Sequence, residues 1–136
     1  MPIDLSSFRK ALDSLEKGLA RAEAEGDDEL LRDGAIQRFE YTYELAWKSL
    51  KRVLEAEAAY AEEVDSLSFR DILRVGAEKG IIAHPEDWFS FREERNISSH
   101  TYDESKAIAV FKMAVSFAPA ARALLCRLLE RQACSP

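Results

Sequence analysis

The segment REERNISSHTYDES, Arg92 to Ser105, concentrates side chains that can move protons and bind anions. Histidine changes its charge near neutral pH, so the imidazole of His100 suits general acid/base catalysis. Arg95 adds a permanent planar cation that can hold a phosphate through two parallel hydrogen bonds. Asn96 can orient the imidazole or donate to a phosphate oxygen. These residue types together point to chemistry on a phosphate group.

The segment combines an arginine and a histidine but has no carboxylate cluster and no set of metal ligands. These residue types suit metal-independent RNA cleavage, so no metal or cofactor is expected. The histidine would help the ribose 2′-hydroxyl attack its own phosphodiester, and the arginine would stabilise the charged intermediate. This reaction leaves a 2′,3′-cyclic phosphate and needs an acid as well as a base. The other histidine, His84, is expected to lie at the start of a helix, away from this segment. A symmetric homodimer with two copies of Arg95 and His100 in one cleft would supply both groups.

A structural interpretation stands beside the catalytic one. Arginine and histidine near helix ends commonly bind the last backbone carbonyls and interact favourably with the helix dipole. In this segment small polar residues crowd the corner, and the phenol of Tyr102 follows His100 closely. This crowding favours a functional site.

Apolar residues recur at steps of three and four along the whole chain, which is the spacing of amphipathic helices. Gly26 is expected to stop the first helix, Ser68 to cap the third and Pro85 to open the fourth. There is no strand pattern and no internal repeat. The sequence predicts an all-α fold, an antiparallel up-and-down four-helix bundle with an additional short helix, as a single domain over residues 1–136. The predicted helical patterns cover residues 5–22, 36–54, 69–80, 85–96 and 101–128.

The corner between the last two predicted helices would position the candidate side chains. Thr101 and Glu104 form a capping-box pair, which starts the last helix at Thr101 and places Tyr102 in its first turn. The end of the preceding helix, which carries Arg95, then converges with this start on His100 and Tyr102. Free N–H groups at the start of the last helix would add an anion-binding site.

Size and composition limit the classes of function. A chain of 136 residues has room for one hydrophobic core, and its net charge of −6 argues against a general surface for polyanions. Any nucleic-acid site must therefore be a local basic pocket. No apolar run approaches the roughly 20 residues of a membrane span, and the first residues lack the apolar core of a signal peptide. Cys126 and Cys134 lack metal-site spacing and are expected to be free thiols, so a cytoplasmic location is expected.

Aromatic and acidic residues share the second predicted helix. Steps of four place Phe39, Tyr43 and Trp47 on one face, which is more often core than a binding platform. Glu40 and Glu44 lie four residues apart in the same stretch, and both are expected to form salt bridges, with Arg95 or Lys48 as the cations. In the fourth predicted helix, Trp88 is expected to pack in the core or a dimer interface, with stacking on a base as the alternative. Glu40 and Glu44 have no accompanying histidine, so they are not expected to hold a metal.

The spacing Arg95-x4-His100-x-Tyr102, with Asn96 directly after the arginine, resembles the motif of the HEPN superfamily. It is most similar to HepT-type toxins and to the related nucleotidyltransferase substrate-binding proteins. A second segment, RDGAIQRFEYTYELAWKSLKRVL over residues 32–54, is similar to the long second helix of that substrate-binding group. The resemblance covers essentially the whole chain in length, helix order and motif position.

The resemblance implies a helical bundle that forms a homodimer with its motifs facing a shared cleft. It implies a minimal nucleotidyltransferase, encoded by a neighbouring gene, that neutralises a ribonuclease toxin by AMPylation of the motif tyrosine, here Tyr102. Arg95 and His100 would be catalytic and Asn96 supportive. The expected contacts with RNA or with the partner are Arg92, Ser98 and Ser99.

The same resemblance supports a different role, that of a non-catalytic substrate-binding subunit of a two-component nucleotidyltransferase. The chain has no Gly-Ser followed by an Asp-x-Asp pair, so it is not expected to be the transferase itself. The intact motif favours the ribonuclease, and the acidic net charge counts against free RNA as its substrate.

Overall fold

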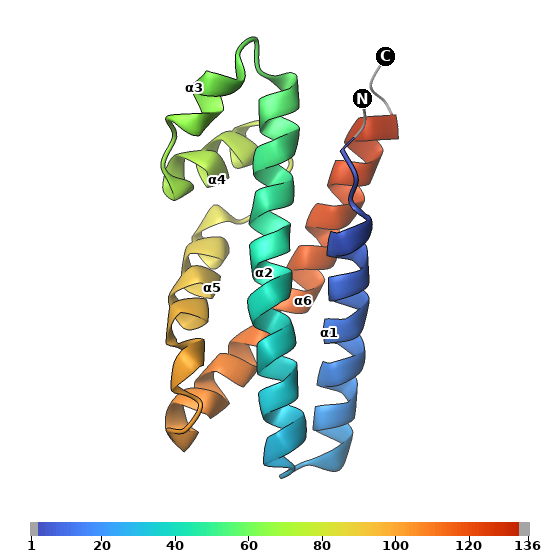
Figure 1. Ribbon diagram of the computed structural model, residues 1–136, viewed down its shortest axis with the longest axis vertical. Helices are drawn as coiled ribbons and strands as arrows, with labels where there is room; N and C mark the ends of the chain where they lie inside the picture. Colours follow the sequence, from blue (N-terminus) through green and yellow to red (C-terminus); the bar gives the residue numbers. More distant parts are fainter. Residues whose placement is uncertain (1–2, 134–136) are drawn as a thin grey trace.

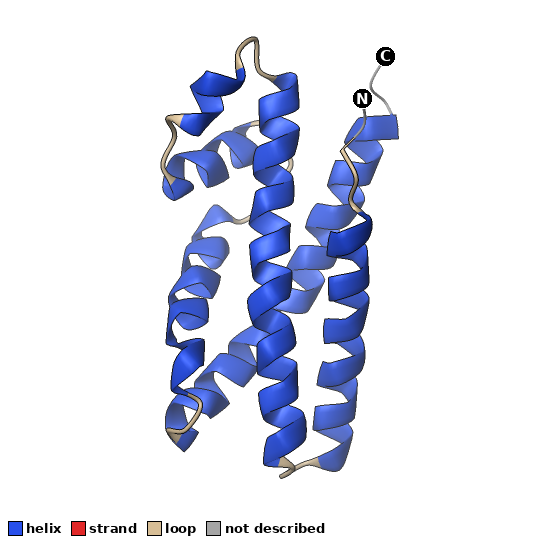
Figure 2. Cartoon of the chain, viewed as in Figure 1, coloured by secondary structure: helices blue, strands red, loops and turns tan. Residues whose placement is uncertain are grey.

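The computed structural model describes residues 3–133, and within this range the chain folds into helices joined by short connections, with no strands (Figure 2). Long helices run up and down the molecule, and shorter ones close one end beside α2 (Figure 1). The predicted all-α bundle is confirmed. The elements are α1 (Ser6–Glu25), α2 (Glu29–Glu57), α3 (Ala61–Asp65), α4 (Phe69–Glu78), α5 (Pro85–Ile97), the 3₁₀ turn η1 (Ser98–His100) and α6 (Glu104–Ala133).

Several helix ends lie where the local chemistry predicts them. Gly26 ends α1 with a φ of 70°, a left-handed conformation that glycine adopts without steric cost. The Asp28 carboxylate accepts hydrogen bonds from two backbone N–H groups at the start of α2, and Ser68 caps α4 by accepting from the N–H of Asp71. Pro85 occupies the first turn of α5.

Two details of the predicted helices are wrong. The last helix begins at Glu104 rather than Thr101, because the Asp103 carboxylate caps it by accepting from the N–H groups of Ser105 and Lys106. Tyr102 therefore lies in the turn before α6, not in its first turn. The short helix α3 was not predicted, because only one of its side chains, Val64, is buried and so leaves no apolar period.

The centre of the core is a cluster of aromatic rings from α2, α5 and α6, which we call the aromatic cluster. The ring of Phe117 lies at its middle and is fully buried. Its centroid is 5.2 Å from Phe39, 5.9 Å from Tyr43, 5.6 Å from Trp88 and 5.3 Å from Phe91. Trp88 therefore packs in the core. The cluster fixes α5, which carries the candidate motif, against α2 and α6.

Ion pairs join α1 to α6. The Arg122 guanidinium on α6 forms ion pairs with Asp13 and Glu16 on α1. Helix α6 has the length and apolar composition of a membrane span, yet its apolar side packs on α1, α2 and α5, as in the core helix of a bundle. Cys126 is a free, exposed thiol on α6, and Cys134 lies outside the described residues.

Candidate functional site

The chain turns sharply where α5 gives way to α6, and Ser98 holds this corner. Its side chain is only 4% exposed, and its hydroxyl donates to the backbone carbonyl of Arg95 at 2.6 Å. The backbone N–H of Ser98 donates to the same carbonyl. Ser98 therefore supplies hydrogen bonds to a backbone carbonyl that the last turn of α5 would otherwise leave without a partner. The burial of its side chain argues against a direct contact with RNA or a partner. Ser99, the next residue, is exposed.

His100 and Tyr102 form a pair at the end of this corner. The hydroxyl of Tyr102 lies 3.2 Å from Nδ1 of His100, and the two ring centroids are 5.8 Å apart in an edge-to-face arrangement. With the imidazole proton on Nε2, the phenol donates to Nδ1. Tyr102 is 84% exposed, and His100 is partly buried. The pair thus presents an accessible phenol directly beside a group able to transfer protons.

The Arg95 side chain reaches from α5 to Glu44 on α2. Its Nη2 lies 3.0 Å from Oε1 of Glu44, whose Oε2 is 3.5 Å from Nζ of Lys48. The predicted salt bridges of Glu44 are both present, whereas Glu40 forms no ion pair within residues 3–133. The Nε of Arg95 is buried and has no hydrogen-bond partner within the part of the chain that the structure describes. The guanidinium therefore pairs with the Glu44 carboxylate and retains an N–H donor, at Nε, that could bind a ligand.

A pocket of about 230 Å³ lies between α2, α4 and α5 beside Arg95. Its walls are aromatic and its polar groups carry both signs of charge. His100, Tyr102, Ser98 and Ser99 are not among its lining residues. The structure thus divides the candidate residues between this pocket and the His100–Tyr102 pair. The lining residues are Tyr43, Glu44, Trp47, Phe69, Arg92, Arg95 and Asn96.

The pocket's lining includes residues whose role the sequence alone did not indicate. The guanidinium of Arg92 stacks over the ring of Phe69, 4.3 Å from the ring centroid. The same ring packs edge to face against Trp47, with centroids 5.6 Å apart. Trp47 was expected in the core with Phe39 and Tyr43, but it is only partly buried. The helical spacing of the aromatic residues on α2 indicated a shared face, but only the placement of α4 beside α2 reveals the pocket.

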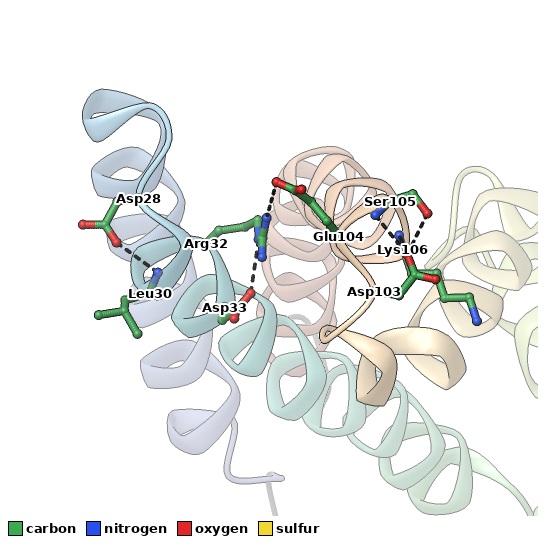
Figure 3. Close-up of polar contacts among 8 residues, drawn as sticks. All are labelled: Asp28, Leu30, Arg32, Asp33, Asp103, Glu104, Ser105 and Lys106. Carbon is green, nitrogen blue, oxygen red and sulfur yellow. Dashed lines mark hydrogen bonds and ion pairs between the residues drawn. The ribbon is translucent and has the colours of Figure 1, made fainter.

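The start of α6 is fixed on two sides (Figure 3). The Asp103 carboxylate accepts from the hydroxyl and the N–H of Ser105, and these bonds, with that from Lys106, lower the pKa of Asp103. On the other side, Nη1 of Arg32 lies 3.9 Å from Oε1 of Glu104 and links the first turn of α2 to α6. The turn that carries Tyr102 is therefore anchored at its C-terminal end.

The second histidine lies at the opposite end of α5. His84 occupies the N-cap position, is exposed, and has its Nδ1 3.8 Å from Glu86. It makes no side-chain capping bond, and it is separated from His100 by the full length of the helix. Among residues 3–133, no three histidine, cysteine, aspartate or glutamate side chains converge in a way that could hold a metal ion.

Comparison with known protein families shows the class to which this helical bundle belongs. The family described as "Nucleotidyltransferase substrate binding protein like" matches residues 3–130. The chain belongs to this family, which places it among HepT-like proteins.

Comparisons with individual relatives agree with this assignment. The chain is 41% identical over 98 residues to the probable ribonuclease HepT of Haemophilus influenzae, covering 72% of this chain and 67% of that protein. A solved structure from the same organism, described as the fold of a substrate-binding domain of a nucleotidyltransferase, matches with a TM-score of 0.87 at 34% identity, covering 92% of this chain and 98% of that one. A crystal structure of a Thermus thermophilus protein matches with a TM-score of 0.66 at 31% identity, covering 84% and 98%.

Proposed function

We propose that this protein is an HEPN-type, metal-independent ribonuclease toxin whose activity a minimal nucleotidyltransferase suppresses by AMPylation of Tyr102. The observation that carries the proposal is the 3.2 Å contact between the exposed Tyr102 hydroxyl and His100, one corner away from Arg95. A group attached to this phenol would lie directly against His100, the proposed proton-transfer residue. The similarity to a protein named probable ribonuclease HepT supports the same function.

The proposed reaction uses the motif residues as follows. The imidazole of His100 takes the proton of the ribose 2′-hydroxyl, and the 2′-oxygen attacks the adjacent phosphorus. The bond to the 5′-oxygen breaks, and this oxygen receives a proton from an acid, leaving a 2′,3′-cyclic phosphate and a 5′-hydroxyl. Arg95 stabilises the added negative charge on the phosphorus, and Asn96, next to it on α5, can donate to a phosphate oxygen.

The acid in this reaction would come from a second copy of the chain, because His84 lies at the far end of α5. An apolar stripe on the first half of α6 supports a homodimer. Ile108 is 41% and Val115 38% exposed, and the partly buried Phe111 lies between them at helical spacing. Exposed apolar side chains aligned on one helix face are typical of interfaces. An Ile108→Lys variant should therefore be monomeric by light scattering and inactive.

The exposure of Tyr102 supports the proposed silencing step. The phenol gives up its proton to a base, its oxygen attacks the α-phosphorus of ATP, and pyrophosphate leaves, so the tyrosine carries an adenylate ester with one negative charge. The modified oxygen no longer donates to His100, and the new charge repels an incoming RNA phosphate. The nucleotidyltransferase partner follows from the family, whose solved relative is described as a substrate-binding domain of such an enzyme.

A second candidate function is a non-catalytic subunit that presents a substrate to the nucleotidyltransferase. The ion pair between Arg95 and Glu44 favours it, because a phosphate must compete with this carboxylate for the guanidinium. The net charge of −6 also weakens attraction to free RNA.

RNA cleavage in EDTA by purified protein, shown by intact mass to carry no adenylate, separates the two functions. The ribonuclease proposal predicts products with 2′,3′-cyclic phosphate ends, and their loss in His100→Ala. If the wild type leaves a broad panel of RNAs as intact as His100→Ala does, the ribonuclease proposal fails and the subunit function stands.

A further inference from the structure

The pocket beside Arg95 has walls suited to a planar ring. Trp47 and Phe69 are both partly buried, meet edge to face and line the pocket, so aromatic surface borders the cavity. The guanidinium of Arg92 adds a planar cation on Phe69. Nucleobases stack on aromatic rings and on arginine planes of this kind. At about 230 Å³ the pocket is smaller than the roughly 300–1,000 Å³ of sites for drug-sized ligands, so it suits one ring system.

Polar atoms at the same pocket lack partners. The buried side-chain atoms without a hydrogen-bond partner in the described part of the chain are the Tyr43 hydroxyl and the Arg95 Nε, and both residues line the pocket. Buried polar groups in folded proteins nearly always have a partner, so two orphans at one pocket indicate a polar ligand. Burial raises the pKa of Tyr43, so its phenol stays protonated and available as a donor.

The charged residues of the pocket would orient a bound nucleotide, because they attract its phosphate and its base to different side chains. Arg95 and Arg92 supply positive charge for a phosphate, while Glu44 offers carboxylate oxygens to the same pocket. A carboxylate accepts from an exocyclic amino group, such as N4 of cytosine, and repels a carbonyl oxygen at that position. Asn96, which also lines the pocket, can donate to or accept from a base or a phosphate.

We propose that this pocket binds one amino-bearing nucleobase, stacked against Trp47 and Phe69 with its amino group on Glu44 and its phosphate on Arg95. The pocket would thereby set the base preference of the site, separately from the His100–Tyr102 pair. That RNA supplies this base rests on the proposed function, whereas binding of a mononucleotide does not.

Titration with CMP and UMP, which differ at position 4 by an amino group and a carbonyl oxygen, tests the pocket directly. We would use the full-length His100→Ala protein, so that cleavage plays no part, and follow tryptophan fluorescence. CMP should quench it and bind about tenfold more tightly than UMP, the size of one charge-assisted hydrogen bond. In Trp47→Phe the quenching should vanish, because the remaining tryptophan, Trp88, is buried in the aromatic cluster.

Glu44→Gln supplies the specificity control, because glutamine can donate to the UMP carbonyl and should bring the two affinities to within about twofold. Glu40→Gln is its matched control, one turn away on α2 and not among the lining residues, and should keep the wild-type ratio. Circular dichroism checks that each variant is folded. Equal affinity of CMP and UMP, or no binding of either at millimolar concentration, would overturn the pocket proposal. If His100→Ala binds CMP while the unmodified wild type cleaves no RNA, the ribonuclease proposal is overturned and the pocket proposal stands.

Discussion

Truncation of Phe117 to alanine should bring the whole bundle close to unfolding. The ring is fully buried and its centroid lies within 5.9 Å of four other aromatic rings. Removing a buried phenylalanine typically costs about 3–5 kcal/mol, and the surrounding rings come from two helices, α2 and α5, that cannot both collapse into the gap. Domains of this size have a free energy of unfolding of about 5–15 kcal/mol. We therefore expect Phe117→Ala to lose about 4 kcal/mol and Phe117→Leu, which keeps most of the volume, about 1–2 kcal/mol.

Urea denaturation followed by circular dichroism measures these differences, with Ser116→Ala as the control. Ser116 is the exposed neighbour on the same helix, so its substitution should change the free energy of unfolding by no more than about 0.5 kcal/mol. A loss below about 1 kcal/mol in Phe117→Ala, at an unchanged denaturant slope, would refute the packing argument. It would mean that α5 and α2 do not depend on this cluster for their relative position.

Three further predictions concern the modified tyrosine, a turn and an ion pair. Tyr102→Phe should cleave RNA within about fivefold of the unmodified wild type, since one exposed hydrogen bond is lost. With the nucleotidyltransferase and ATP it should gain no mass and stay active; silencing of this variant would exclude the proposed switch. Gly26→Ala should lower the free energy of unfolding by roughly 1–2 kcal/mol, because alanine is strained at a φ of 70°. No neighbouring atom would crowd the new Cβ, so this backbone strain is the whole cost. An unchanged urea midpoint would contradict the prediction. Glu57 has a pKa lowered by its hydrogen bonds to Arg131 and then Lys79, so its contribution to stability is present above the ordinary glutamate pKa of 4.5 and is lost as the pH falls through the lowered value. The melting-temperature difference between wild type and Glu57→Gln should accordingly shrink on acidification, and a difference that grows would show the sign to be wrong.

The helical architecture could be predicted because apolar periodicity and capping residues agree along most of the chain. Gly26, Ser68 and Pro85 each act locally, and the structure uses them as their chemistry predicts. The start of α6 could not be decided in this way, because two capping signals overlap there. Thr101 with Glu104 forms a capping-box pair, but Asp103 competes two residues later and accepts from the free N–H groups.

The candidate site was predictable only in part, for a physical reason. The motif lies on one continuous segment, so sequence spacing alone could place His100 near Tyr102. The pocket joins α2, α4 and α5, and its aromatic wall depends on how the tertiary packing brings Phe69 to Trp47 and Arg92. No local pattern encodes that juxtaposition. The pairing of Arg95 with Glu44 was anticipated only as one of two options for the carboxylate.

The exposure of Tyr102 determines how quickly the proposed toxin can be silenced. A hydroxyl that is 84% exposed in the folded protein can enter another enzyme's active site without any part of the bundle opening first. The lag between release of a new chain and its inactivation would then depend on the concentration of the transferase and its encounter rate. A cell would keep the proposed toxin inactive by maintaining a sufficient concentration of the modifying enzyme. Loss of that supply would leave existing molecules silent and only newly made ones active, so the onset of toxicity would follow the pace of protein synthesis.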